Sequence, residues 1–386
     1  MPPSHPQPLL EIRDLRVGFT VDEGYLRAVD GVSLDLAEGE TLGLVGESGC
    51  GKSVTALSLL RLIPQPPGRI ESGSVLFRGR DLLRLPVEEL RAVRGRDISL
   101  IFQEPQQAFS PLHRIGDQLV ETLQFHQPIS RPDALRLARE WLERVGIGDP
   151  EERLYAYPHQ LSGGMLQRIM IVMALFLHPA LIIADEPTTA LDVTIQAQIF
   201  SLMKALKEDR TALILITHDL GAIWEMCDRV AVMYASRIVE TGTVAELFAR
   251  PAHPYTQALM QSIPSLTHPA ERLEVIPGQV PSPLAYPAGC RFQDRCPHAF
   301  ARCRTEYPPD YPKPEGGTVT CFLAEPDGQS VSPPLVGVPF RGQSVGPPLV
   351  GVPFRRRPST SEGPTQDLAH VRTIAPNSAN KGEVTP

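Results

Sequence analysis

The sequence has 386 residues, of which 42% are hydrophobic and 21% charged, as is ordinary for a globular protein with one large or two modest domains. Its formal net charge of −7 argues against nucleic-acid binding by bulk electrostatics. No stretch approaches the ~20 apolar residues of a membrane-spanning helix. Residues 1–8 lack the features of a signal peptide, so we expect a cytosolic protein whose six cysteines stay reduced.

Residues 10–80 predict strands around a tight loop that is followed by a helix. Residues 28–36 alternate between apolar and polar positions, as a half-buried strand does. Residues 41–45 form a short apolar run, which is typical of a central parallel strand. A helix should follow from residue 52 to residue 62 and end before Pro64.

The chain then alternates between helices and strands up to about residue 250. Helical periodicity covers residues 115–145 and 163–178, and further buried strands are predicted at 181–184 and 212–217. This alternation predicts an α/β core with a parallel sheet. The helical stretch over about 104–178 indicates a subdomain inserted into that core.

A complete phosphate-binding loop lies between the strand at 41–45 and the predicted helix. It consists of Gly46, Glu47, Ser48, Gly49, Cys50, Gly51, Lys52 and Ser53. The glycines let backbone N–H groups surround phosphates, Lys52 should hold the β- and γ-phosphates, and Ser53 should ligate Mg²⁺. A chance glycine turn is the alternative, and the flanking strand and helix disfavour it.

Three other strand ends carry candidate catalytic side chains. Asp185 and Glu186 follow a buried strand, where Asp185 suits Mg²⁺ coordination and Glu186 suits a general base that orients water. Gln103 and His218 also follow apolar runs. Each is a weak signal alone, but Gln103 could sense Mg²⁺ and the attacking water, and His218 could donate to a γ-phosphate.

Four cysteines gather late in the chain, at positions Cys290, Cys296, Cys303 and Cys321. Four thiolates can hold Zn²⁺ or an iron–sulfur cluster, and the absence of a Cys-x2-Cys pair tilts the prediction towards [4Fe–4S], with Zn²⁺ as the alternative. Four unrelated buried thiols would be the simplest alternative. A structural clip is favoured over electron transfer, because no redox partner site is visible.

Residues 326–386 are rich in proline, glycine and serine and contain a 14-residue repeat, since 329–342 is nearly copied by 343–356. Two copies are too few for a solenoid, so a disordered tail is predicted. The alternative is a proline-rich docking segment.

One further motif sets the class of nucleotide enzyme. It contains Leu161, Ser162, Gly163, Gly164, Met165, Leu166 and Gln167, and it resembles the signature of ATP-binding cassette (ABC) ATPases. The phosphate loop then matches Walker A, Gln103 the Q-loop, residues 181–186 Walker B, residues 190–192 with Asp192 the D-loop, and His218 the switch histidine. These motifs stand in the family's order over residues 10–250.

The resemblance implies ATP and Mg²⁺ as ligands and a second ABC ATPase subunit as partner. Two cassettes would enclose ATP head to tail, with the signature of one acting on the nucleotide of the other. An aromatic residue upstream of Walker A usually stacks on adenine in this family. Phe19 is favoured over Tyr25 for that place.

A finer resemblance is to the ATPase subunits of dipeptide and oligopeptide importers. It is carried by residues 157–160, 184–194 and 253–256 and by the cysteines from Cys290 onwards, and it supports the [4Fe–4S] assignment. It implies an ATPase domain at 8–250 and a C-terminal domain at 251–325. One departure lies at residues 106–111, where Gln-Gln-Ala-Phe-Ser-Pro replaces the more usual Met-Thr-Ser-Leu-Asn-Pro.

The same resemblance implies an ATPase that powers peptide uptake together with two transmembrane permease subunits and an extracytoplasmic solute-binding protein. The chain would lie peripherally at the cytoplasmic face of the cell membrane. The alternative is a soluble ABC ATPase that is not coupled to transport.

Overall fold

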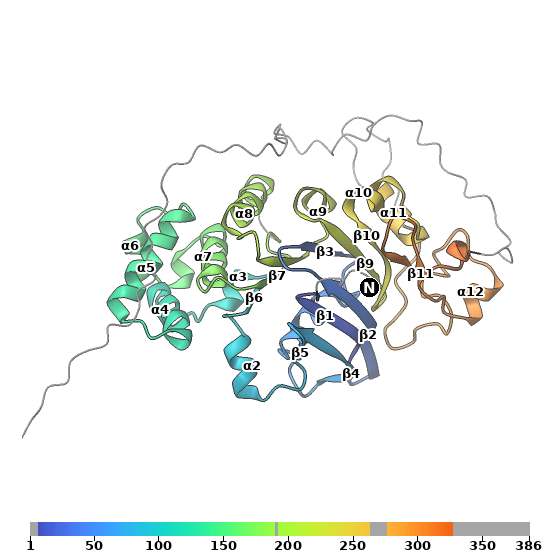
Figure 1. Ribbon diagram of the computed structural model, residues 1–386, viewed down its shortest axis with the longest axis horizontal. Helices are drawn as coiled ribbons and strands as arrows, with labels where there is room; N and C mark the ends of the chain where they lie inside the picture. Colours follow the sequence, from blue (N-terminus) through green and yellow to red (C-terminus); the bar gives the residue numbers. More distant parts are fainter. Residues whose placement is uncertain (1–6, 190–191, 263–275, 327–386) are drawn as a thin grey trace, which may run out of the picture. The chain divides into compact units, whose positions relative to one another are not determined.

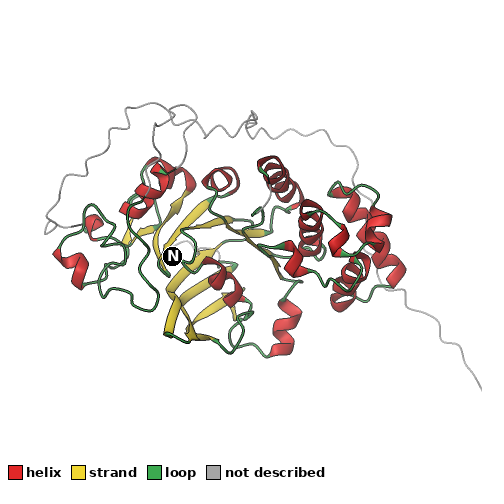
Figure 2. Cartoon of the chain, turned by 180° about the vertical axis from the view of Figure 1, so that it is seen from behind, coloured by secondary structure: helices red, strands yellow, loops and turns green. Residues whose placement is uncertain are grey.

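A computed structural model describes residues 7–189, 192–262 and 276–326, and it places them on two β-sheets flanked by helices (Figures 1 and 2). The larger sheet has the order β11-β12-β10-β9-β3-β8-β7-β6. Its parallel strands are β3 (Thr41–Val45), β6 (Ile98–Ile101), β7 (Leu181–Asp185), β8 (Ala212–Ile216) and β9 (Arg229–Tyr234). Its antiparallel edge consists of β10 (Arg237–Thr243), β12 (Thr318–Val319) and β11 (Tyr311–Pro312).

The smaller sheet is antiparallel and has the order β2-β1-β4-β5. It contains β1 (Leu10–Val21), β2 (Gly24–Leu36), β4 (Gly68–Phe77) and β5 (Arg80–Asp81). One hydrophobic core joins this sheet to α1 (Lys52–Leu59) and to the parallel strands, through buried side chains such as Leu15, Leu59 and Ile183. The two sheets therefore enclose the helix that follows the phosphate loop.

The helices between β6 and β7 lie together on one side of the large sheet (Figure 1). They are α3 (Pro105–Ala108), α4 (Ile115–His126), α5 (Arg131–Arg144), α6 (Pro150–Tyr155), η1 (Pro158–Gln160) and α7 (Gly163–Leu175). A second core joins Trp141 and Ile169 of these helices to Leu213 of the sheet. The sequence predicted a helical stretch over about 104–178, and these helices lie within those bounds.

The remaining helices connect or flank the strands. They are α2 (Val87–Val93), α8 (Val193–Leu206), α9 (Leu220–Met226), α10 (Val244–Ala249), α11 (Pro254–Gln261), α12 (Ala301–Thr305) and η2 (Phe322–Ala324). The C-terminal residues add β12 to the edge of the large sheet, where Val319 pairs with Glu240 of β10. The predicted tail beyond residue 326 lies outside the described residues.

Three predicted helices differ from those observed. The helix predicted at 52–62 ends at Leu59, because Arg61 adopts a left-handed backbone with φ of 52° and the Arg94 guanidinium binds the Leu60 carbonyl. The stretch predicted at 115–145 divides into α4 and α5 around Pro128, since proline cannot donate a backbone hydrogen bond within a helix.

The predicted third helix, 163–178, ends three residues early, at Leu175. The strands predicted at 41–45, 181–184 and 212–217 agree with β3, β7 and β8 to within one residue. Short buried runs in a parallel sheet are therefore the elements that this sequence specifies best, because both faces of each strand must be apolar.

Candidate nucleotide site and four-cysteine cavity

The phosphate loop runs from the carboxyl end of β3 to the start of α1, and two of its glycines have no possible substitute. Gly46 and Gly51 have φ of 154° and 104°. A Cβ at Gly46 would lie 2.0 Å from the Met233 carbonyl oxygen, and one at Gly51 would lie 2.1 Å from that of Ala28. The loop can therefore turn its N–H groups inward only because these positions lack side chains.

Lys52 lies at the first position of α1 and is only 5% exposed. Its ammonium donates to the carbonyl oxygens of Gly46 and Glu47 at 2.9 and 3.0 Å, and the Cys50 sulfur lies 3.8 Å away. These carbonyls carry only partial charges, so an anion arriving in the loop would be a stronger partner for the buried ammonium. Ser48 and Gly49 are exposed at the tip of the same loop.

Asp185 ends β7 beside the phosphate loop and is 8% exposed. Its Oδ1 atom is buried and has no hydrogen-bond partner within the described part of the chain. Burial raises the pKa of Asp185 and the neighbouring Glu186 charge adds to this, while the Ser53 hydroxyl and the charge of Lys52 oppose it. An orphaned carboxylate oxygen next to a serine hydroxyl is a donor set that fits Mg²⁺.

Glu186 is the point at which three strand ends meet. Its Oε2 atom accepts hydrogen bonds from Gln103, which follows β6, at 3.1 Å and from Thr189 at 2.8 Å. The same oxygen lies 3.7 Å from Nδ1 of His218, which follows β8. The Glu186 backbone has φ of 45°, a left-handed conformation that is held by its N–H donating to the Ile216 carbonyl at 2.8 Å. The structure thus unites the predicted Gln103, Glu186 and His218, and adds Thr189.

The signature residues surround the start of α7. Ser162 is the N-cap of this helix and accepts a hydrogen bond from the Met165 N–H at 3.3 Å. Ser162 and Gly163 are exposed, and the space beside the Cα of Gly163 is open. Leu161 and Met165 pack against the core, and Gln167 is buried. The helix therefore offers its electropositive end and a hydroxyl outward, as an anion-binding surface does.

The remaining residues of the sequence prediction are Asp192 of the D-loop and the two candidates for the adenine contact, Phe19 and Tyr25. Asp192 caps α8 by accepting from the Ile195 N–H at 3.0 Å, while positions 190 and 191 of the predicted D-loop lie outside the described residues. Phe19 of β1 packs partly buried against the core between the sheets. Tyr25 is 45% exposed, and its hydroxyl donates to Glu71 at 2.8 Å.

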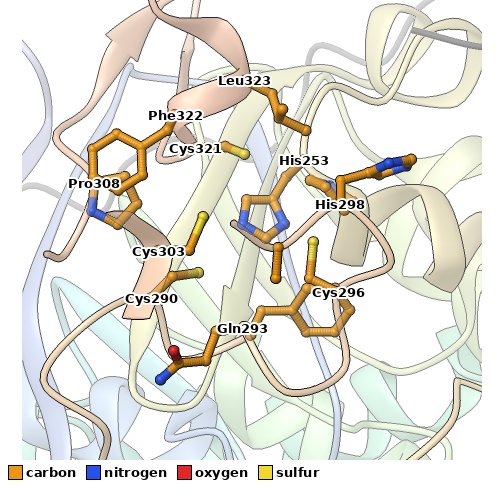
Figure 3. A pocket seen from close by; sticks show the side chains of 13 residues that line it. His253, Cys290, Gln293, Cys296, His298, Cys303, Pro308, Cys321, Phe322 and Leu323 are labelled. Atoms are coloured by element: carbon orange, nitrogen blue, oxygen red, sulfur yellow. The ribbon is translucent and has the colours of Figure 1, made fainter. Parts of the chain in front are cut away.

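The four late cysteines line one cavity of about 20 Å³, together with His253, Phe292 and η2 (Figure 3). Burial raises the pKa of the Cys296 thiol to about 11 and that of Cys321 to about 12. The backbone N–H groups of Phe292, His298 and Leu323 partly oppose the rise in the pKa of the Cys290, Cys296 and Cys321 thiols, respectively. The structure thus brings the four cysteines that the sequence singled out to one cavity.

The thiols are not arranged around a single point. Across residues 7–189, 192–262 and 276–326, no group of three or more His, Cys, Asp or Glu side chains is placed to hold one metal ion. A mononuclear Zn²⁺ site needs four sulfurs around one centre, whereas a cluster binds each sulfur to a different iron and needs a wider spacing.

Sequence reasoning missed the C-terminal contacts to the phosphate loop. Arg295 pairs with the Glu47 carboxylate at 3.0 Å, and the Tyr255 hydroxyl accepts from the Glu47 N–H at 2.9 Å. The arginine next to Cys296 carried no motif. Tyr255 lies within residues 253–256, which resemble the importer ATPases, but that resemblance names no contact.

Comparison with known proteins agrees with this geometry. The family described as "ABC transporter" matches residues 29–189, and "Oligopeptide/dipeptide transporter, C-terminal region" matches residues 239–303. The ATP-binding cassette MJ0796, solved as a dimer bound to ADP and Pi, superposes with a TM-score of 0.55 at 26% identity, over 61% of this chain and 98% of that one. The fold and the site therefore define an ABC-type ATPase.

Sequence relatives narrow the class. The chain is 53% identical to the "Probable peptide ABC transporter ATP-binding protein y4tR" of Sinorhizobium fredii, over 78% of this chain and 90% of that protein. It is 47% identical to the dipeptide transport ATP-binding protein DppD of Bacillus subtilis, over 82% and 95%, and 48% identical to the oligopeptide transport ATP-binding protein OppD of that species, over 84% and 92%. The chain belongs to the family of ATP-binding subunits of dipeptide and oligopeptide ABC transporters.

This result confirms the family and the ATPase activity that the motifs predicted. Among the described residues, none of the helices combines the length and the apolarity that crossing a membrane would require.

Proposed function

We propose that this chain binds and hydrolyses ATP to drive the uptake of dipeptides, oligopeptides or similar small solutes through an ABC importer. The observation that carries the proposal is the convergence of Gln103, Glu186 and His218 beside the phosphate loop. The class of cargo is taken from the names of two relatives, a dipeptide transport and an oligopeptide transport ATP-binding protein.

In this proposal the site residues have distinct roles. Lys52 and the loop N–H groups hold the phosphates, and Ser53, Asp185 and Gln103 hold Mg²⁺ directly or through water, which the orphaned oxygen of Asp185 supports. Mg²⁺ would neutralise the charge that develops on the phosphates. Glu186 is the base that orients water, because its carboxylate already accepts from groups that fix its position.

His218 completes the site, and its side chain is 70% exposed. We propose that it donates to the γ-phosphate once a partner closes the site. Gln103, between the ATP site and the inserted helices, would transmit the presence of Mg²⁺ to them.

The exposed signature supports a paired arrangement. Ser162 faces outward at the electropositive end of α7, so we propose that it binds the γ-phosphate held by a second ABC ATPase subunit. The MJ0796 cassette, which was solved as a dimer, supports this arrangement. The pair would join two transmembrane permease subunits, fed by an extracytoplasmic solute-binding protein, at the cytoplasmic face of the membrane.

We also propose the division of the chain into an ATPase domain at 8–250 and a C-terminal domain at 251–325. The region that matches the transporter C-terminal family begins within β10 and supports a boundary near there. The cavity cysteines would hold a [4Fe–4S] cluster that clips the C-terminal loops together, an interpretation supported by the four half-buried thiols that line one cavity.

The cluster has a direct test. Protein purified without oxygen should contain about four irons per chain and absorb broadly near 400 nm, and substituting Cys296 by Ala should remove both. The matched control is Cys227→Ala, since that cysteine lies in another part of the fold. Zinc in place of iron would exclude the cluster, and a lack of both metals would exclude any metal role.

The catalytic proposal is tested in the assembled complex. Glu186→Gln should retain ATP binding and lose ~10²–10⁴-fold in ATP turnover, as expected when a positioned base is removed. Peptide uptake should fall in parallel. Glu225→Gln, an exposed change on α9, is the control and should behave as wild type. Turnover near wild type in Glu186→Gln would show that another group acts as base.

A further inference from the structure

Glu47, the second residue of the phosphate loop, is held at three different groups. Its N–H donates to the Tyr255 hydroxyl at 2.9 Å, and its carboxylate accepts from Arg295 at 3.0 and 3.1 Å. Its carbonyl accepts from Lys52 at 3.0 Å. Two of the three holding groups come from the C-terminal residues, 208 and 248 positions away in the sequence.

Arg295 is built into the fold as a buried cation. Its side chain is 6% exposed, and its guanidinium also donates to the carbonyls of Ile276 and Pro277 and to the Tyr234 hydroxyl. A guanidinium buried this deeply is costly unless an anion compensates it. Glu47 supplies that carboxylate. The phosphate loop therefore provides the counterion of a C-terminal residue.

Tyr255 is equally fixed. Its ring is fully buried, with centroids 4.6 Å from Tyr234 and 5.5 Å from Phe292. Burial raises the pKa of its hydroxyl, which stays protonated and accepts from the Glu47 N–H. Phe292 also lines the four-cysteine cavity, and Arg295 immediately precedes Cys296. The segment that carries the cavity cysteines thus reaches the phosphate loop through packed rings and one ion pair.

We propose that Arg295 and Tyr255 are positioning residues for ATP, which hold Glu47 and thereby preset the phosphate loop. The inference rests on the proposed function. When ATP binds, Lys52 must exchange the Glu47 carbonyl for phosphate oxygens, and a fixed Glu47 keeps the ammonium and the loop N–H groups in place for that exchange. The free-energy cost of ordering the loop is then met when the protein folds, so it does not reduce the affinity for ATP.

The test measures the affinity of the full-length chain for a fluorescent ATP analogue with Mg²⁺. Arg295→Ala should weaken binding about 10-fold, because a buried charged hydrogen bond is lost, and Arg295→Lys should restore part of it. Tyr255→Phe should weaken binding about 3-fold. In the assembled complex, KM for ATP should rise while kcat at saturating ATP stays within about 2-fold. Arg304→Ala, an exposed arginine next to Cys303, should change neither.

A double-mutant cycle separates positioning from general loosening. Glu47→Gln removes the charge that Arg295 pairs with. Adding Arg295→Ala to Glu47→Gln should therefore weaken binding of the ATP analogue by less than about 2-fold. Independent, multiplying losses would overturn the inference. If Arg295→Ala does not fold, Arg295→Lys and Tyr255→Phe carry the test.

The two proposals fail differently. Wild-type protein that does not bind ATP would defeat the proposed function. Wild-type protein that binds ATP, with Arg295→Ala, Arg295→Lys and Tyr255→Phe binding equally well, would defeat only the positioning role. A fall in kcat with KM unchanged would also defeat it, since that outcome assigns these residues to a later step.

Discussion

Asp30 and Asp185 are both buried carboxylates, but their electrostatic surroundings are opposite. Asp30, on β2, accepts from Arg237 at 2.9 Å and from Arg291. Although its burial alone would raise the pKa of Asp30, the two guanidinium groups lower it. In the part of the chain that the structure describes, Oδ1 of each carboxylate lacks a hydrogen-bond partner, but that of Asp30 lies 3.3 Å from the Arg16 guanidinium. For Asp185, at the end of β7, burial raises the pKa.

The difference separates a structural charge from a functional one. A compensated buried carboxylate joins parts of a fold, and Asp30 joins β2 to β10 and to Arg291 of the C-terminal residues. An uncompensated carboxylate is tolerated where a ligand supplies the missing charge. The same substitution, Asp to Asn, should therefore act on stability at one site and on chemistry at the other.

The largest effect is expected for Asp30→Asn. It leaves two guanidinium groups, one of them buried, without their anion, and should lower the free energy of unfolding by ~3–5 kcal/mol. The measurement is urea unfolding of the full-length chain. Asp35→Asn is the matched control, since its ion pair with Arg229 is largely exposed and should be worth less than about 1 kcal/mol.

Acid titration gives the same comparison a second readout. Because the pKa of folded Asp30 lies below its usual 3.8, its contribution is fully present above that value and is lost as the pH falls through the lowered pKa. Wild-type protein should lose this stability progressively as the pH falls below about 4, and Asp30→Asn should not. Equal acid sensitivity in the two proteins would show that other carboxylates dominate.

The next largest effect is expected for Asp185→Asn, and it should fall on turnover. Losing a Mg²⁺ carboxylate should cost at least ~10²-fold in ATP hydrolysis, because metal charge stabilisation is worth several kcal/mol. Stability should stay equal or rise slightly, since a desolvated carboxylate with a raised pKa is removed. Marked unfolding of Asp185→Asn would place Asp185 with Asp30 as a structural charge.

The contrast also explains what the sequence could reveal. The phosphate loop, Asp185, Glu186 and His218 were predictable because chain-local patterns place them at strand ends, and parallel strands bring those ends to one edge. The four cysteines were predictable as a set because thiols are rare. Their separation around a cavity, and not around one point, depends on loops that no periodicity describes.

The Asp30 and Glu47 contacts could not be predicted. Arg291 and Arg295 lie 261 and 248 residues from these carboxylates, and arginine is too common in a sequence to indicate a partner. These pairs exist because the C-terminal residues pack against the nucleotide-binding core, and that docking is a tertiary property. Likewise, Arg61 ended α1 early through a backbone conformation that residue type alone does not specify.

A smaller effect is expected at the signature, where a charge can be introduced without loss of the helix cap. Asp and Asn are both good N-cap residues, so Ser162→Asp and Ser162→Asn should leave stability unchanged within ~0.5 kcal/mol. Only Ser162→Asp places a negative charge where it would repel the triphosphate bound by a partner subunit. It should therefore weaken ATP-driven association at least ~10-fold more than Ser162→Asn. Association is measured by light scattering in the presence of ATP, with both Ser162 variants made in the Glu186→Gln background. Equal association of both variants would show that Ser162 does not lie near a phosphate.

The smallest effect concerns the aromatic residue that stacks on adenine. Phe19→Ala should raise KM for ATP about 2- to 10-fold, which corresponds to ~0.5–1.5 kcal/mol of ring contact, and Tyr25→Ala should change it less. Phe19 also packs against the core, so Phe19→Leu is needed to keep that packing while removing the flat ring. A larger KM change in Tyr25→Ala than in either Phe19 variant would show that adenine stacks on the exposed Tyr25, at the end of the β1–β2 hairpin.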